Sequence, residues 1–181
     1  MFFLRRSHLE RLPVVMSGVR MGERALQIGV NDPALAGAIA AKVGLSGHAA
    51  MVVADEHGAA AARRAAAIGG ALVDVQIAPL DSLPFSEGAF DAIVLHAAVT
   101  LPSIESATGV AMLRDCHRVL RVGGRIVVIE GEARGILGAL LKAQRLSPDA
   151  GPFVAALGAA GFRAGRVLGE REGYRFIEGL K

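Results

Sequence analysis

Two kinds of segment alternate along the chain. The first is a short apolar run that barely alternates with polar positions, which is typical of a strand buried on both faces of a parallel sheet. The second is Ala-rich or amphipathic and of helical length. Strands are expected over residues 25–29, 49–56, 73–78, 90–96, 124–131, 165–170 and 174–180, and helices over 32–43, 58–68, 105–120 and 152–160.

Regular alternation of strand and helix predicts a doubly wound α/β fold. Only residues 171–173 separate the last two strands, too few for a crossover helix, so these strands are expected to pair antiparallel. The pattern predicts a mostly parallel, seven-stranded sheet with one antiparallel strand at the C-terminal hairpin. This domain is expected over residues 22–181, with residues 1–21 forming a helical segment that caps the site.

Composition narrows the classes of partner. The hydrophobic fraction of 52% is rich in Ala, and the 20 Lys and Arg residues form no stripe interleaved with aromatics, so nucleic-acid binding is not expected. No apolar run approaches the roughly 18 residues that span a bilayer. The first residues lack the apolar core of a secretory signal, and the single Cys116 suits a reducing compartment. We expect a cytoplasmic protein without a membrane segment.

In open α/β sheets, ligands bind beyond the carboxyl ends of the strands. The first predicted strand ends at Gly29, where the lack of a Cβ lets a ligand approach the backbone. Asp32 suits an N-cap and Pro33 a first helical turn. Asp32 is also expected to compete with a bound carboxylate for the free N–H groups of that turn. A plain strand-to-helix turn is the alternative.

A pair of carboxylates, Asp55 and Glu56, ends the second predicted strand. A carboxylate some 26 residues past Gly29 can accept hydrogen bonds from the ribose hydroxyls of an adenosine-containing cofactor. The alternative role is to cap the helix that follows.

The other titratable side chains give weaker evidence for a functional site. His96 ends the fourth predicted strand, where it is a candidate general base or a residue that lines a pocket. Cys116 lies at helical spacing among apolar residues and is expected in the core. The remaining histidines have no metal-ligand spacing, so no metal site is predicted.

Three segments carry a family resemblance. They are LPFSEGAFDAIVLH, HRVLRVGGRIVVIE and GAAGFRAGRVLGEREGYRFIEG, and their order and spacing resemble class I S-adenosylmethionine (SAM)-dependent methyltransferases of the ubiquinone/menaquinone-biosynthesis type. The resemblance implies SAM as cofactor. It also implies a set of cofactor-binding positions: Gln27, Gly29 and Asn31 in the first loop, Asp55 and Glu56 at the ribose, Leu80, Asp81 and Ser82 beside adenine, and His96 and Ala97 facing the methionine moiety and the substrate.

The chain departs from the family pattern at two of these positions and at one neighbouring position. Gln27 stands where an acid is usual, Asn31 replaces a glycine, and Pro79 replaces an acid. These changes predict weakened binding of SAM, or binding of a different adenosine-like ligand. The leading hypothesis is methyl transfer to a small-molecule acceptor, with a protein partner or a homodimer as further options.

Two other hypotheses remain. The first is a catalytically inactive methyltransferase-like module for binding or assembly, which the altered positions favour. The second is a nicotinamide-dependent enzyme. It is disfavoured because only Gly29 stands in a loop that would need G-x-G-x-x-G.

Overall fold

The computed structural model describes residues 11–97, 101–104, 106–131 and 150–181. Within these residues the strands are β1 (Arg24–Ile28), β2 (His48–Val53), β3 (Val73–Ile77), β4 (Phe90–Ala97), β5 (Leu120–Gly131), β6 (Arg163–Arg171) and β7 (Tyr174–Leu180). The helices are α1 (Leu12–Met16), α2 (Pro33–Ala41), α3 (Glu56–Gly69), α4 (Ala107–Val119) and α6 (Gly151–Ala159).

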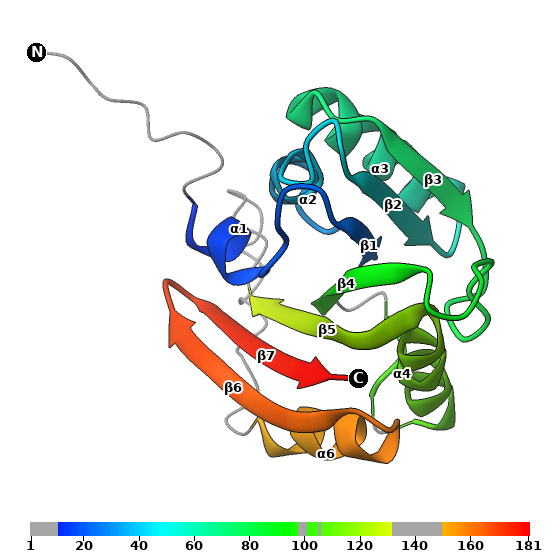
Figure 1. Ribbon diagram of the computed structural model, residues 1–181, viewed down its shortest axis with the longest axis vertical. Coiled ribbons are helices and arrows are strands. Elements are labelled where there is room, and N and C mark those ends of the chain that lie inside the picture. Colours follow the sequence, from blue (N-terminus) through cyan, green and yellow to red (C-terminus); the bar gives the residue numbers. More distant parts are fainter. Residues whose placement is uncertain (1–10, 98–100, 105, 132–149) are drawn as a thin grey trace, which may run out of the picture.

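All seven strands join one sheet in the order β3-β2-β1-β4-β5-β7-β6 (Figure 1). The pairs from β3 through β5 are parallel, whereas β7 runs antiparallel to both β5 and β6. The prediction of a mostly parallel sheet with one reversed strand is therefore confirmed. Because β1 and β4 are neighbours although β2 and β3 lie between them in sequence, the strand order reverses there, and the expected ligand site lies at their carboxyl ends.

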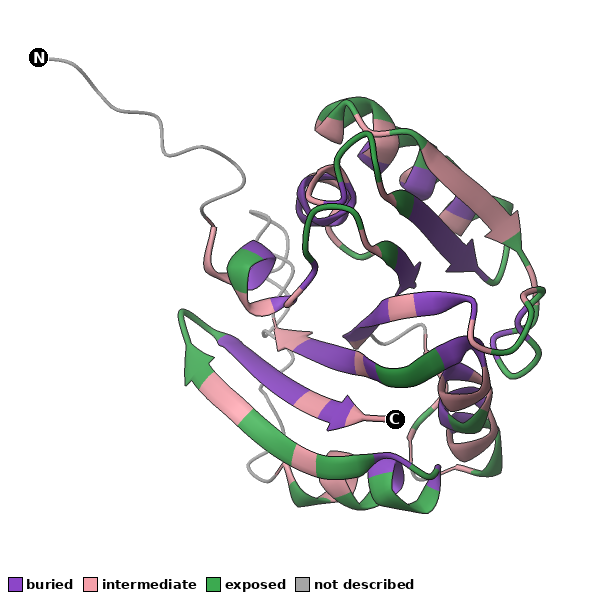
Figure 2. Cartoon of the chain, in the orientation of Figure 1, coloured by how far each residue is buried: buried purple, intermediate pink, exposed green. Residues whose placement is uncertain are grey.

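The central strands are buried on both faces, as their continuous apolar runs predict. On one face, Leu26 and Ile93 pack with residues of α4 and α6; on the other, Met51 and Val94 pack with α2 and α3. Figure 2 shows burial concentrated in the central strands, while β6 at the sheet edge is largely exposed. The site edge therefore rests on a rigid, fully packed centre.

Several predicted boundaries differ from the observed ones, and two of the differences have a clear physical cause. The helix expected to end at residue 120 ends at Val119, because the fully buried Leu120 adopts an extended backbone and pairs with Phe90 at the start of β5. The strand expected over residues 49–56 ends at Val53, because Asp55 already serves as the N-cap of α3. In both places tertiary packing or capping ends the element before the local apolar pattern does.

The helices α2 and α3 approach each other unusually closely. A Cβ added to Gly37 would lie 2.2 Å from the carbonyl oxygen of Ala65, and one added to Gly69 would lie 2.3 Å from that of Gly37. Only glycines at these positions allow the two backbones to touch.

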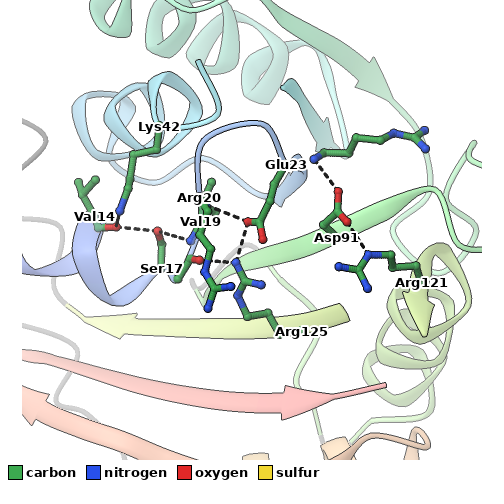
Figure 3. Close-up of polar contacts among 11 residues, drawn as sticks. Val14, Ser17, Val19, Arg20, Glu23, Lys42, Asp91, Arg121 and Arg125 are labelled. Atoms are coloured by element: carbon green, nitrogen blue, oxygen red, sulfur yellow. Dashed lines mark hydrogen bonds and ion pairs between the residues drawn. The ribbon is translucent and has the colours of Figure 1, made fainter. Parts of the chain in front are cut away.

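The N-terminal segment from Arg11 to Glu23 is fastened to the domain (Figure 3). Arg125 on β5 donates to the carbonyl of Gly18 and, at 2.7 Å, to the carboxylate of Glu23, while Lys42 Nζ lies 3.4 Å from the carbonyl of Val14. The helix α1 contacts α2. These contacts hold the segment beside α2, whereas residues 1–10 of the predicted cap lie outside the described residues. A capping role for residues 1–21 stays a prediction.

Among the described residues, no helix is both long and apolar enough to cross a membrane.

Candidate functional site

A buried side-chain pair joins β1 to β4. Gln27 on β1 is 1% exposed and His96 near the end of β4 is 3% exposed, with 2.8 Å between Gln27 Oε1 and His96 Nε2. Gln27 Nε2 donates to the carbonyl of Ala36 in α2 at 2.9 Å. Since a carbonyl only accepts, the Gln27 amide has one allowed orientation, and His96 Nε2 must be the donor to Oε1.

His96 is therefore a neutral imidazole with its proton on Nε2. Burial lowers the pKa of His96 to about 4, and the negative charge of Asp32 raises the pKa but does not offset the burial. Such a ring is uncharged near neutral pH and a weak base there, since a general base works best with a pKa close to the working pH. The hydrogen bond to Gln27 fixes its orientation instead.

The loop after β1 faces the end of β4. Gly29 has φ +74°, a backbone conformation that residues other than glycine rarely adopt. Asn31 Nδ2 lies 3.5 Å from the carbonyl of Ala97, so the loop and the end of β4 are in contact. The sequence-predicted residues Gln27, Gly29, Asn31, His96 and Ala97 are thus brought together in the structure.

Asp32 occupies the first turn of α2. Its Oδ1 accepts from the backbone N–H groups of Ala34 (2.9 Å) and Leu35 (3.1 Å), and Pro33 has no N–H to offer. Asp32 is thus the N-cap of α2, and its competition with a bound carboxylate for these donors stays a prediction. The second oxygen, Oδ2, lies 3.3 Å from Nη2 of Arg11 in the N-terminal segment.

A hollow opens beside this loop at the ends of β4 and β5. The residues that line it are Asn31, Asp32, Leu35, His96, Ala97, Ile129, Gly131 and Tyr174. Asp32 is the charged residue among them, and the rest of the wall is apolar or neutral. The hollow can therefore hold a small group beside the Asp32 carboxylate.

The carboxylates after β2 differ in what they contact. Asp55 Oδ1 accepts from the backbone N–H of Gly58 at 2.8 Å, which is the helix-capping role. Asp55 is exposed, and its second oxygen contacts no donor among the described residues. Glu56, in the first turn of α3, lies 3.6 Å from Arg63. Each of the two keeps one carboxylate oxygen that meets no donor in the described part of the chain, and Asp55 lies nearer the end of β2.

The loop after β3 supplies one apolar and two polar side chains. Leu80 is buried in the core, whereas Asp81 and Ser82 are exposed in a turn closed by the Ser82 N–H on the Pro79 carbonyl at 3.2 Å. Since β3 lies beside β2 and runs parallel to it, this turn follows the same edge of the sheet as Asp55.

Cys116 is completely buried, and burial raises the pKa of its thiol, so it is a core residue as expected. Across the described ranges, no group of three His, Cys, Asp or Glu side chains is placed to hold a metal ion.

Part of the hollow is formed by residues outside the set predicted from the sequence. Leu35, Ile129, Gly131 and Tyr174 line it, and Gly131 pairs with Tyr174 across β5 and β7. A Cβ on Gly131 would lie 2.4 Å from the Tyr174 ring, so the glycine makes room for the ring. A glycine ending one strand and a tyrosine opening the reversed strand are the features that could have revealed this wall.

Comparison with known proteins agrees with this geometry. A family model described as a methyltransferase domain matches residues 26–128. The ubiquinone/menaquinone biosynthesis C-methyltransferase UbiE of Geotalea uraniireducens (strain Rf4) is 32% identical over 60 residues, which cover 33% of this chain and 24% of that protein. The chain therefore matches about a quarter of that relative's length.

Solved structures show the same fold at low identity. A SAM-dependent methyltransferase from Aquifex aeolicus superposes with a TM-score of 0.70 at 16% identity, covering 92% of this chain and 86% of that one. A methyltransferase described as putative, from Methanococcus maripaludis, gives 0.68 at 14% identity and covers 100% and 97%. PigF, solved with SAH, gives 0.62 at 22% identity and covers 88% and 50%.

The family match covers more than half of the chain and includes the loop after β1, the carboxylate after β2 and the end of β4. The chain belongs to the methyltransferase domain family, whose methyl donor is S-adenosylmethionine.

Proposed function

We propose that the protein transfers the methyl group of SAM to a small-molecule acceptor. The observation that carries the proposal is the convergence of three features at one edge of the sheet. These are the Asp55 carboxylate after β2, the positive-φ Gly29 after β1, and the hollow beside His96 after β4. A ligand that crosses three adjacent strand ends meets all of them.

The residues fit the ribose end of SAM well. Asp55 keeps one exposed oxygen for a ribose hydroxyl while its other oxygen caps α3, so ribose binding does not require the helix to lose its cap. Gly29 presents bare backbone next to it. At the amino-acid end the fit differs from the usual family pattern, because Asp32 already satisfies the N–H groups of Ala34 and Leu35.

SAM would supply a methyl group bound to a positively charged sulfur. A lone pair of the acceptor forms the new bond to the methyl carbon, while the carbon–sulfur bond breaks and its electron pair stays on the sulfur. The protein's part is mainly alignment, which supplies much of the rate in such reactions. We assign His96 to the wall that positions the acceptor, since a neutral ring of low pKa is a poor base. A general-base role for His96 therefore has little support.

The test is calorimetric titration of the purified protein with SAM and with S-adenosylhomocysteine, followed by the Asp55→Ser variant. Serine keeps the N-cap hydrogen bond to Gly58 and removes the carboxylate, so the helix stays capped. Loss of the hydrogen bond between a ribose hydroxyl and the charged carboxylate predicts affinity lower by about 10- to 100-fold. Unchanged affinity in Asp55→Ser would contradict the assigned ribose site.

One observation favours the second hypothesis, a catalytically inactive binding or assembly module. The first N–H groups of α2 are engaged by Asp32 within the protein itself. If folded wild-type protein binds neither ligand even at millimolar concentration, the enzyme hypothesis fails and the module hypothesis stands. The acceptor's identity, any partner protein or homodimer, and a cytoplasmic location stay predictions.

A further inference from the structure

An ion pair stands beside the hollow, between Asp32 on its wall and Arg11 of the N-terminal segment. Asp32 lines the hollow and is 28% exposed at its side chain, and Arg11 reaches it from the N-terminal segment with its own side chain 32% exposed. The 3.3 Å separation between Nη2 and Oδ2 is long for a charge-assisted hydrogen bond. Both groups keep hydrogen-bonding capacity for a further partner.

The usual acid of the first strand is absent here. Gln27 is neutral, and both ends of its amide are engaged by Ala36 and His96. Among the described residues that line the hollow, Asp32 carries the carboxylate that a ligand ammonium would meet. A ligand carboxylate finds the α2 N–H groups engaged and meets the Arg11 guanidinium instead.

The order of the strands places these charges at the correct end of the ligand. Asp55 follows β2, Gly29 follows β1, and the hollow follows β4 and β5, in the spatial order β2-β1-β4-β5. A ligand with its ribose at Asp55 that extends past Gly29 has its far end at the hollow. In SAM, that far end is an α-amino acid with one ammonium and one carboxylate.

We propose that Arg11 and Asp32 together recognise the zwitterionic amino-acid end of the cofactor, Asp32 binding its ammonium and Arg11 its carboxylate. This inference rests on the proposed function. Arg11 is held in place for the role, because α1 contacts α2 and Arg125 and Lys42 fasten the segment that follows it (Figure 3).

The test uses two ligands that differ only at this end. S-adenosylhomocysteine carries the amino acid, and 5′-methylthioadenosine has the same adenosine and thioether sulfur without it. Asp32→Asn removes the charge but keeps an acceptor for the N–H groups of Ala34 and Leu35, so α2 stays capped. Glu87→Gln, an exposed carboxylate on another loop, controls for the loss of one negative charge.

Calorimetry should show Asp32→Asn weakening S-adenosylhomocysteine by about tenfold or more while methylthioadenosine is unchanged, since a hydrogen bond to a charged group is lost from only one ligand. Arg11→Gln should act in the same direction, Arg11→Lys should restore part of the affinity, and Glu87→Gln should leave both ligands unaffected. Thermal melting of each variant checks that the fold is intact.

The outcomes separate the two proposals. If wild type binds both ligands but Asp32→Asn weakens them equally, or weakens neither, the recognition pair is refuted and the methyltransferase proposal stands. If wild type binds neither ligand, the proposed function itself is refuted, and this inference with it.

Discussion

Restoring the family's usual acid with Gln27→Glu should harm this protein. Gln27 donates to the Ala36 carbonyl at 2.9 Å and accepts from His96 at 2.8 Å, and it is 1% exposed. An ionised glutamate only accepts hydrogen bonds. It would accept the hydrogen bond from His96 but set a negative oxygen against the Ala36 carbonyl, at a position buried from solvent.

The magnitude follows from proton linkage. A protonated glutamate can donate to Ala36 as the amide does, so the variant is close to wild type when protonated. Burial of this kind raises a glutamate pKa by about 2–3 units above its free value of about 4.3. At about 1.4 kcal/mol per unit, the variant loses about 3–4 kcal/mol at high pH. Because folding raises the pKa of the new carboxyl, the variant keeps its full unfolding free energy below pH about 4.3 and loses stability as pH rises through that raised pKa.

Urea unfolding at about pH 5 and about pH 8 measures this loss, which should be about 1 kcal/mol at the lower pH and about 3 kcal/mol or more at the higher pH. Gln27→Met is the uncharged control. It should lose about 1–3 kcal/mol from the broken hydrogen bonds, with little added pH dependence. A Gln27→Glu variant as stable as wild type at about pH 8 would refute the reasoning, because it would show that His96 accepts a proton and forms an ion pair.

Two further predictions concern stability. The pKa of His96 is lowered to about 4 in the folded protein, against about 6.5 in the unfolded chain, so the neutral ring contributes roughly 3 kcal/mol of stability that is present above pH about 6.5 and is lost as pH falls through about 4. The His96→Gln variant should lack this part of the wild-type pH profile of unfolding free energy, and an unchanged profile would contradict the burial of a neutral ring. Gly37→Ala should lower the unfolding free energy by about 3 kcal/mol or more, because its Cβ would lie 2.2 Å from a backbone oxygen. The control Gly158→Ala in α6, where a Cβ meets nothing within 4 Å, should be neutral or stabilising by up to about 1 kcal/mol, and equal effects of the two variants in chemical denaturation would argue against the close helix contact.

The fold could be predicted almost entirely from the sequence, because burial on both faces leaves a continuous apolar pattern in each central strand. The three-residue gap before Tyr174 was enough to predict the reversed strand. The exact ends of the helices and strands were harder to predict from the sequence. Leu120 lies in a helical pattern by sequence, and only its burial against the sheet next to Phe90 makes it extended.

The candidate site could be predicted only at strand ends. Gly29, Asp55 and His96 follow apolar runs and stand out in the sequence for that reason. The contact between Gln27 and His96 joins residues 69 positions apart, and that between Arg11 and Asp32 joins residues 21 apart. No local pattern encodes such pairs, so the sequence shows Gln27 as a missing acid and cannot show that its amide is engaged at both ends.

The glycine contact between α2 and α3 has a consequence for ligand choice. The first helix starts beside Asp32 and the second beside Asp55, the residues assigned to the two ends of the cofactor. Backbones that touch at Gly37 and Gly69 cannot slide past each other without a clash or separate without losing close packing, so the distance between the two carboxylates is fixed. Selectivity against shorter or longer nucleosides would then depend on two glycines that do not contact the ligand. Engineering the protein to accept a different methyl donor would begin at that distant helix contact.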